Sequence, residues 1–258
     1  MTIQITLSDA PFYIIGIALV VGAVWFLIRR KNTKPSNANK AVPVNVTKLI
    51  STSFHAARSK YGTLNQSWIA ASFSIGGRLP HSLLTASVQR DGELDPVLRC
   101  MEDEQALLAL KETDDNQFGF HYQKMLSELW VGSLYETLRL LIERKLAPSN
   151  DKFKRLAHEF RLLRIPLEKH ELAGDDRLTE PLVMQRLPAK GDNSDYYTYP
   201  KGRDPTRAHI MPSGISARGS VMWQVIDLHT STSIWLERRH LADRFLSLWQ
   251  STTQSSQS

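Results

Sequence analysis

The sequence predicts a mainly α-helical protein, made of a single N-terminal transmembrane helix and a cytoplasmic helical domain with a small β-hairpin near the C-terminus. Three observations support this prediction. Residues 10–28 contain no charged side chain and are followed at once by three basic residues. Apolar residues recur at helical spacing over much of 47–172. The run 220–228 is rich in β-branched and aromatic residues, as strands are.

The uncharged run 10–28 is long enough to cross a bilayer. As a helix it would measure about 28 Å, close to the hydrocarbon thickness of about 30 Å. Inside a bilayer every backbone N–H and C=O needs a partner, so a single spanning segment is expected to be helical. Tyr13 and Trp25 lie near its two ends, where aromatic rings favour the membrane interface. The lipid bilayer is therefore the first expected partner.

The charges around the run predict its orientation. Residues 1–9 contain one charged side chain, an aspartate, whereas Arg29, Arg30 and Lys31 follow the run. Basic residues stay on the cytoplasmic side, so we expect the N-terminus outside the inner or plasma membrane and the domain in the cytoplasm. We also expect the basic residues to meet anionic head groups. A cleaved signal peptide, whose basic residues would precede the run, and a buried core helix are the alternatives.

Two small residues in the predicted span, Ala18 and Gly22, are four positions apart. This spacing allows two membrane helices to approach closely. A homodimer through this face is one hypothesis. Small residues that simply face lipid are the alternative.

The composition indicates an ordinary folded domain behind a basic linker. The net charge is +6, but residues 29–40 contain five basic residues and no acidic one, so the remainder is near neutral. The charge therefore makes no general case for nucleic-acid binding. The single cysteine, Cys100, excludes an internal disulfide framework. The expected segments are an outer N-terminus, the span, a linker, a helical domain and a disordered tail, at 1–9, 10–28, 29–46, 47–250 and 251–258.

The first half of the domain is predicted to be helical throughout. Helices are expected at 47–62 and 64–74, and Asp95 followed by a proline is a typical start for a helix over 95–110. The longest predicted helix covers 118–146. Its expected core-facing apolar stripe contains Phe118, Tyr122, Met125, Leu129, Leu134, Leu138, Leu141 and Ile142.

The second half begins with a helix over 151–172, capped by Asn150 or Asp151 and antiparallel to the preceding one. Pro166 removes a backbone donor inside it, so we expect a kink or break near Arg164. Residues 175–218 are rich in Pro, Gly, Asp and Ser and are expected to lack regular structure, as an ordered excursion or a mobile loop. Beyond them we expect a strand at 220–228, its hairpin partner at 207–211, and a last helix starting at Ser233.

The histidines and carboxylates do not form a metal-binding pattern. His158 and His170 are twelve residues apart with a proline between them, so a straight helix cannot bring both to one ion. Glu237 and His240 form an E-x-x-H pair, but a di-iron bundle needs a second one. The sequence also contains no phosphate-binding glycine loop. We therefore expect no metal and no cofactor.

Arg164 and His170 are the candidate catalytic residues. They enclose the stretch R-I-P-L-E-K-H, an arginine followed by a histidine after five residues. This spacing resembles the catalytic motif of the helical ribonuclease superfamily called HEPN, although isoleucine follows the arginine where that family usually has a polar residue. The resemblance implies RNA cleavage by Arg164 and His170. Arg203 and His209 match the same spacing.

Two functions of different classes follow. The first is a membrane-anchored interaction or scaffolding module that holds an unknown protein partner at the inner face of the membrane. The second is a membrane-tethered HEPN-like ribonuclease. We favour the first, which is not an enzyme, because the sequence shows no convergent set of catalytic residues.

Overall fold

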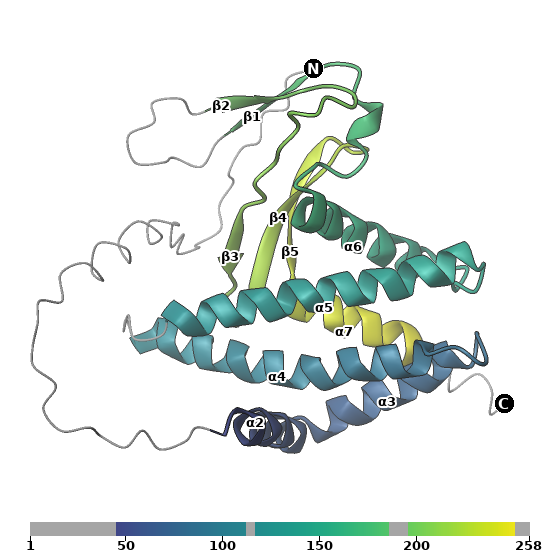
Figure 1. Cartoon of the computed structure of the whole chain (residues 1–258), viewed down its shortest axis with the longest axis vertical. Helices are drawn as coiled ribbons and strands as arrows, with labels where there is room; N and C mark the ends of the chain where they lie inside the picture. Colours follow the sequence, from purple (N-terminus) through teal and green to yellow (C-terminus); the bar gives the residue numbers. More distant parts are fainter. Residues whose placement is uncertain (1–44, 112–116, 186–195, 251–258) are drawn as a thin grey trace, which may run out of the picture.

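The computed structural model describes residues 45–111, 117–185 and 196–250, which form a mainly helical protein with two small antiparallel sheets (Figure 1). The predicted membrane span, 10–28, lies outside the described residues. Among the helices that the structure describes, none is both long and apolar enough to cross a membrane.

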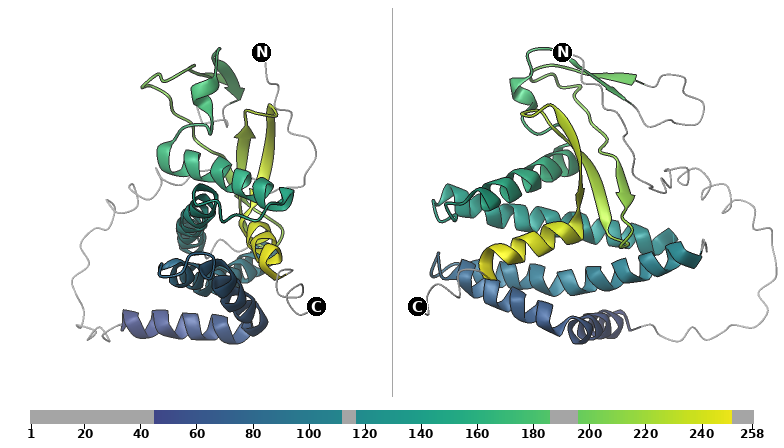
Figure 2. Two further views of the ribbon diagram at one scale, coloured as in Figure 1. Left: turned by 90° about the vertical axis from the view of Figure 1, so that its right-hand side faces the viewer. Right: turned by 180° about the vertical axis from the view of Figure 1, so that it is seen from behind.

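Six helices make up most of the described chain. Their bounds are α2 (Val46–Lys60), α3 (Gly62–Gly76), α4 (Leu84–Lys111), α5 (Gln117–Glu143), α6 (Asp151–Lys169) and α7 (Arg238–Gln250). Helix α4 packs against α2, α3 and α5, and α7 packs against α3 and α6 (Figures 1 and 2). The helices predicted at 47–62, 64–74, 118–146 and 151–172 are thus confirmed in kind and place.

The prediction that a helix starts at Asp95 is wrong, because α4 begins at Leu84 and Pro96 lies inside it. The side chain of Asp95 does not cap a helix. Its Oδ2 accepts a hydrogen bond from Trp68 Nε1 at 2.9 Å, and its Oδ1 lies 2.5 Å from Arg238 Nη1. The carboxylate therefore joins α4 to α3 and α7, and the helix continues through the proline.

The expected break near Arg164 is also absent, because α6 runs through Pro166 to Lys169. The predicted cap is present, since Asn150 Oδ1 accepts a hydrogen bond from Phe153 N at 2.7 Å. Pro166 removes only one backbone donor, and it is buried close to the end of the helix, where His170 adopts a left-handed conformation with φ 57°. Packing of this last turn offsets the lost hydrogen bond.

The main sheet contains three antiparallel strands, β3 (Ser213–Ile215), β4 (Val221–Asp227) and β5 (Thr232–Glu237), in that order. The predicted strand at 220–228 is confirmed as β4. Its expected partner at 207–211 is wrong, because β4 pairs with β3 and β5. The predicted helix at Ser233 starts instead at Arg238, because the residues before it form β5. There buried Leu236 lies opposite buried Trp223 of β4.

A second sheet lies within the segment that was expected to be irregular. Strands β1 (Leu182–Gln185) and β2 (Tyr196–Tyr199) pair antiparallel, with Leu182 opposite Tyr199. Tyr199 is fully buried, donates to Asp175 Oδ2 and accepts from Leu172 N at 3.1 Å. Tyr199 therefore joins β2 to the residues that follow α6.

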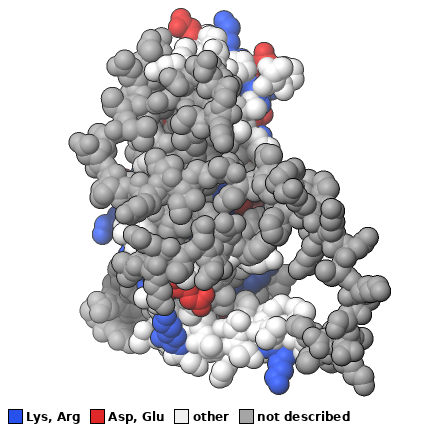
Figure 3. Space-filling model, turned by 90° about the vertical axis from the view of Figure 1, so that its left-hand side faces the viewer, with Lys and Arg blue, Asp and Glu red and all other residues white. Residues whose placement is uncertain are grey.

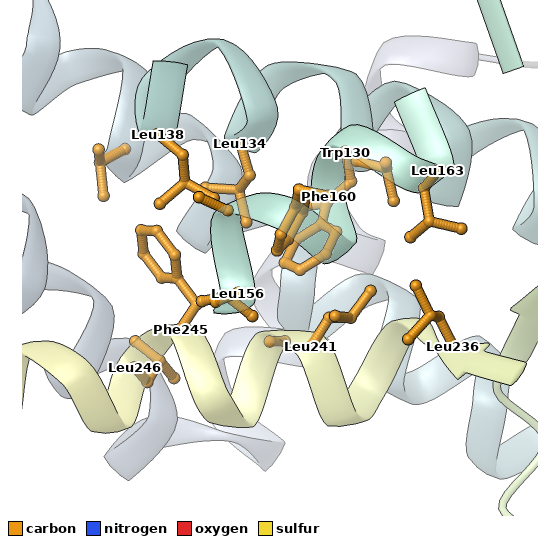
Figure 4. Packing of buried hydrophobic residues seen from close by; sticks show 14 of the residues in the cluster. Trp130, Leu134, Leu138, Leu156, Phe160, Leu163, Leu236, Leu241, Phe245 and Leu246 are labelled. Carbon is orange, nitrogen blue, oxygen red and sulfur yellow. The ribbon is translucent and has the colours of Figure 1, made fainter. Parts of the chain in front are cut away.

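The hydrophobic core lies where α5, α6 and α7 meet. Figure 4 shows Trp130 and Leu134 of α5 facing Phe160 and Leu163 of α6, with Leu241 and Phe245 of α7 below them; all are buried. The ring of Phe245 also stacks on Trp68 of α3 with centroids 5.3 Å apart. These contacts fix α5 in the body of the protein.

Candidate functional site

The first half of α5 exposes apolar side chains to solvent. Tyr122, Met125 and Leu129, called the outer stripe below, are 52%, 43% and 63% exposed. The prediction that these residues face the core is therefore wrong, although Leu134, Leu138 and Leu141 of the same helix are fully buried. Exposed apolar residues gathered on one face are typical of a surface that binds a partner.

The inner face of this half-helix carries buried polar side chains beside apolar ones that pack against the core. Gln123 and Ser127 are fully buried there. Gln123 Nε2 donates to the carbonyl of Gly219 at 2.7 Å, in the turn between β3 and β4. Gly219 has φ +73°, and a Cβ atom on it would lie 1.9 Å from the carbonyl oxygen of Glu102. The tight turn takes the place that apolar side chains of α5 would otherwise fill.

A groove with a volume of about 620 Å³ continues from the outer stripe along the same face of α5. Its apolar lining comes from the first turn of α4, from α5 and from the end of α6. Leu84, Leu140 and Leu167 contribute to this lining, together with Met125 and Leu129 of the outer stripe. The stripe and the groove together, called the docking face below, form one continuous surface.

A glycine keeps the middle of the groove open. Gly132 lies between the outer stripe and Leu140, and a Cβ atom on it would be 3.1 Å from Glu168 Oε1. Such a contact is tighter than ordinary van der Waals packing. The absence of a side chain at Gly132 therefore leaves room for the carboxylate of Glu168 beside α5.

The charges around the groove are balanced within the chain. Arg164 Nη2 lies 2.6 Å from Glu168 Oε2 and 3.4 Å from Glu136 Oε1. Arg139 also pairs with Glu136 at 2.7 Å. On the described part of the surface seen in Figure 3, acidic and basic side chains are likewise interspersed. The acidic side chains that line the groove are thus paired, whereas Arg90, which also lines it, is 71% exposed.

The structure places the two predicted catalytic residues in different surroundings. The guanidinium of Arg164 faces α5, where it pairs with Glu136 and lies 5.4 Å from the ring centre of Tyr135. His170 is exposed at the C-terminal cap of α6. No contact joins Arg164 to His170 in the described structure. Arg164 therefore joins α6 to α5 at the edge of the groove. Catalysis by Arg164 and His170 stays a prediction.

The second arginine–histidine pair also separates, since Arg203 is exposed and His209 is buried. His209 Nδ1 lies 2.9 Å from the hydroxyl of Tyr197, and its backbone N–H donates to the carbonyl of His170 at 2.7 Å. Burial lowers the pKa of His209 to about 4, so the ring is neutral at physiological pH. The buried His209 ring therefore contacts β2 through the hydroxyl of Tyr197.

The remaining predictions concern the membrane-interface residues and metal binding. Tyr13, Trp25, Arg29, Arg30 and Lys31, the expected membrane-interface residues, lie outside the described residues. Within the described ranges, no three His, Cys, Asp or Glu side chains are placed to hold a metal ion. Compared with known proteins, the chain matches no family model, no curated protein and no solved structure.

The sequence contained a sign of the docking face that the prediction missed. At 100° per residue, Tyr122, Met125 and Leu129 cluster about 150° around the helix from Trp130, Leu134 and Leu138. These are two stripes rather than one. A helix with two apolar faces has a second surface to bury. The described structure buries only one of the two apolar faces of α5.

Proposed function

We propose that this protein is a membrane-anchored interaction module whose docking face binds an amphipathic helix. Residues 10–28 would hold it in the inner or plasma membrane, and the domain would lie in the cytoplasm. The observation that supports the proposal most is the exposed outer stripe on the first half of α5, which continues into the groove. Apolar anchors spaced by three and four residues are what helix-in-groove recognition uses.

The energy available at the docking face fits a membrane-confined contact. Full burial of a large apolar side chain contributes about 1.5–3 kcal/mol. Because the three residues of the outer stripe are only 52%, 43% and 63% exposed, covering them offers about 2–5 kcal/mol. Association costs at least about 4 kcal/mol in lost freedom of motion. The remaining affinity is modest, and the predicted span would strengthen it by raising the local concentration of any partner in the same membrane.

The test is a photo-cross-linking experiment on the full chain in native membranes. A photoreactive amino acid replaces Leu129, which is exposed and needs no repacking. The matched control replaces Ile142, which lies on the same helix and is 51% exposed but does not line the groove. We expect a discrete adduct from position 129 that maps to a helical segment of the partner, and much less from position 142.

A charge placed on the docking face provides the second arm of the experiment. Met125→Glu should abolish the adduct formed at position 129, because a carboxylate would have to be desolvated in the contact. Ile142→Glu should leave it unchanged. Equal adducts from positions 129 and 142, or an adduct that survives Met125→Glu, would show that the face is not a docking surface.

A further inference from the structure

We infer that the first half of α2, residues 46–53, lies in the surface of an anionic lipid bilayer. The inference goes beyond the proposed function, because it concerns a surface other than the docking face and a lipid rather than a protein. It rests on the exposure of this half-helix, on its charge and on its place in the chain.

The first half of α2 projects from the body of the protein. Every residue from 45 to 53 is exposed, so the described structure covers none of this half-helix. The second half packs against α4, where Ala57 is buried and Lys60 Nζ lies 2.6 Å from Asp103 Oδ2. Figures 1 and 2 show α2 at the end of the molecule opposite to β1 and β2. The helix is therefore held at one end and free to meet a partner at the other.

Three apolar side chains of this projecting half, called the α2 stripe below, share one side of the helix. Val46, Leu49 and Ile50 are spaced by three and four residues and are 60%, 59% and 54% exposed. The helix start is fixed, because Asn45 Oδ1 accepts a hydrogen bond from Lys48 N at 2.9 Å. An exposed apolar stripe on such a helix is what an interfacial membrane helix buries among lipids.

The charge of this part of the chain favours an anionic lipid surface. Residues 10–90 contain ten basic side chains and no acidic one. Within the described residues, Arg58 and Lys60 of α2 pair with acidic residues of α4, but Lys48 pairs with none. A helix with apolar side chains on one side and unpaired basic charge on the other is complementary to acyl chains below anionic head groups.

The place of α2 in the chain keeps it near the predicted membrane. Seventeen residues separate the end of the predicted span, at 28, from Val46. Even fully extended, a segment of this length reaches only about 60 Å. Lipid therefore meets the α2 stripe at high effective concentration. A single weak membrane signal binds only marginally and reversibly, whereas two signals together hold a protein on the bilayer.

Fluorescence quenching of the full chain in lipid vesicles tests this contact. In a Cys100→Ser background, which removes the only cysteine, the dye nitrobenzoxadiazole is attached to Leu49→Cys or to Ser51→Cys. Ser51→Cys is the matched control, because both positions are exposed and they lie about 160° apart around the helix. The vesicles contain phosphatidylcholine and phosphatidylglycerol, with nitroxide-labelled lipid in both leaflets, so that either orientation of the chain is detected.

We expect the nitroxide lipid to quench the dye several-fold more at position 49 than at position 51. In vesicles of phosphatidylcholine alone the quenching at position 49 should fall several-fold, because the anionic head groups are missing. Equal quenching at positions 49 and 51 would overturn the inference. Undiminished quenching in phosphatidylcholine alone would contradict the choice of an anionic surface.

A charge placed on the α2 stripe provides the second arm. Ile50→Glu should remove the quenching at position 49, because a carboxylate would have to leave water and meet anionic head groups. The control is Val183→Glu, since Val183 is 48% exposed on β1, at the opposite end of the molecule, and its replacement should change nothing.

Two further results would overturn the inference while leaving the docking face untouched. The first is quenching at position 49 that survives Ile50→Glu. The second is weak quenching in vesicles combined with protection of Leu49→Cys from a maleimide in native membranes, which would assign the α2 stripe to a protein partner.

Discussion

Arg238 lies at the junction of β5 and α7 with no exposed surface, and its guanidinium contacts two carboxylates of α4. Nη1 lies 2.5 Å from Asp95 Oδ1, and Nε lies 2.6 Å from Glu102 Oε1. Burial disfavours the charged form of Asp95, but Arg238 and Arg99 outweigh it and lower the pKa of this carboxyl. A buried group of this kind is stable only while every member is present.

Removal of Arg238 should therefore strongly destabilise the folded protein. Arg238→Met leaves Asp95 and Glu102 buried without their cation, and we expect a loss of about 3–5 kcal/mol in the free energy of unfolding. The control is Arg218→Met. Arg218 pairs with Glu237 at 2.7 Å but is 48% exposed, so its loss should cost less than about 1 kcal/mol. Denaturant unfolding followed by tryptophan fluorescence measures both, and equal losses would contradict the prediction.

Two buried titratable groups should give opposite dependences of stability on pH. Burial lowers the pKa of His209 from 6.5 to about 4, so between these values the unfolded chain binds more protons there and stability falls as pH falls. Burial raises the pKa of Asp91 from 3.8 to about 6, so the folded chain binds more protons and stability rises as pH falls. Each group changes the free energy of unfolding by about 3 kcal/mol over the pH range between its folded and unfolded pKa values.

The matched variants separate the two effects. Relative to the unmodified chain, His209→Gln should gain stability as pH falls from 6.5 to 4, because it no longer takes up a proton on unfolding. Asp91→Asn should lose stability over 6 to 4, because it lacks the proton that the folded carboxyl holds. Unfolding curves recorded at several pH values measure both differences. If the free energy of unfolding of both variants changes with pH in the same way as that of the unmodified chain, neither group titrates as stated.

At the scale of the elements, the contact between α3 and α4 depends on a glycine. A Cβ atom on Gly92 of α4 would lie 2.6 Å from the Cβ atom of Trp68, which is buried in α3. Alanine in a helix normally stabilises by about 0.5–1 kcal/mol relative to glycine. Here overpacking should reverse the sign, and Gly92→Ala should destabilise by about 1–3 kcal/mol.

Gly62 of α3 provides the control for this substitution. A Cβ atom there would meet nothing within 4 Å, so Gly62→Ala should be neutral or stabilising by up to about 1 kcal/mol. Thermal unfolding of the two variants gives both values. A stabilised Gly92→Ala variant would mean that α3 moves away from α4 at no cost.

The helices and strands also show which features can be predicted from the sequence alone. Helical periodicity and the Asn150 cap were sufficient for most of α2, α3, α5 and α6, because these patterns depend on neighbouring residues. The start of α7 was misplaced because the residues from Ser233 take up strand pairing only when β4 lies beside them. Periodicity could not reveal this long-range partner.

The docking face was missed for a related reason. Tyr122, Met125 and Leu129 are apolar residues at helical spacing, which local reasoning assigns to the core. They are exposed because the turn at Gly219, almost a hundred residues later in the sequence, occupies space on the core side of α5. Only the tertiary structure shows which of two apolar stripes is covered.

At the scale of the whole molecule, the predicted orientation is testable with single cysteines. In a Cys100→Ser background, Thr2→Cys should react with a membrane-impermeant maleimide added to intact cells. Ser255→Cys should react only after the cells are permeabilised. This expectation follows from the basic residues after the predicted span, which favour the cytoplasmic side. Labelling of Ser255→Cys in intact cells would reverse the topology.

The buried contacts of Arg238 also have a consequence for synthesis. The arginine is 143 residues beyond Asp95 and 136 beyond Glu102. While α4 emerges from the ribosome, its two carboxylates have no cation to neutralise them in a closed core. The helices can form early, but their final closure must wait until Arg238 has also been synthesised and has reached the two carboxylates.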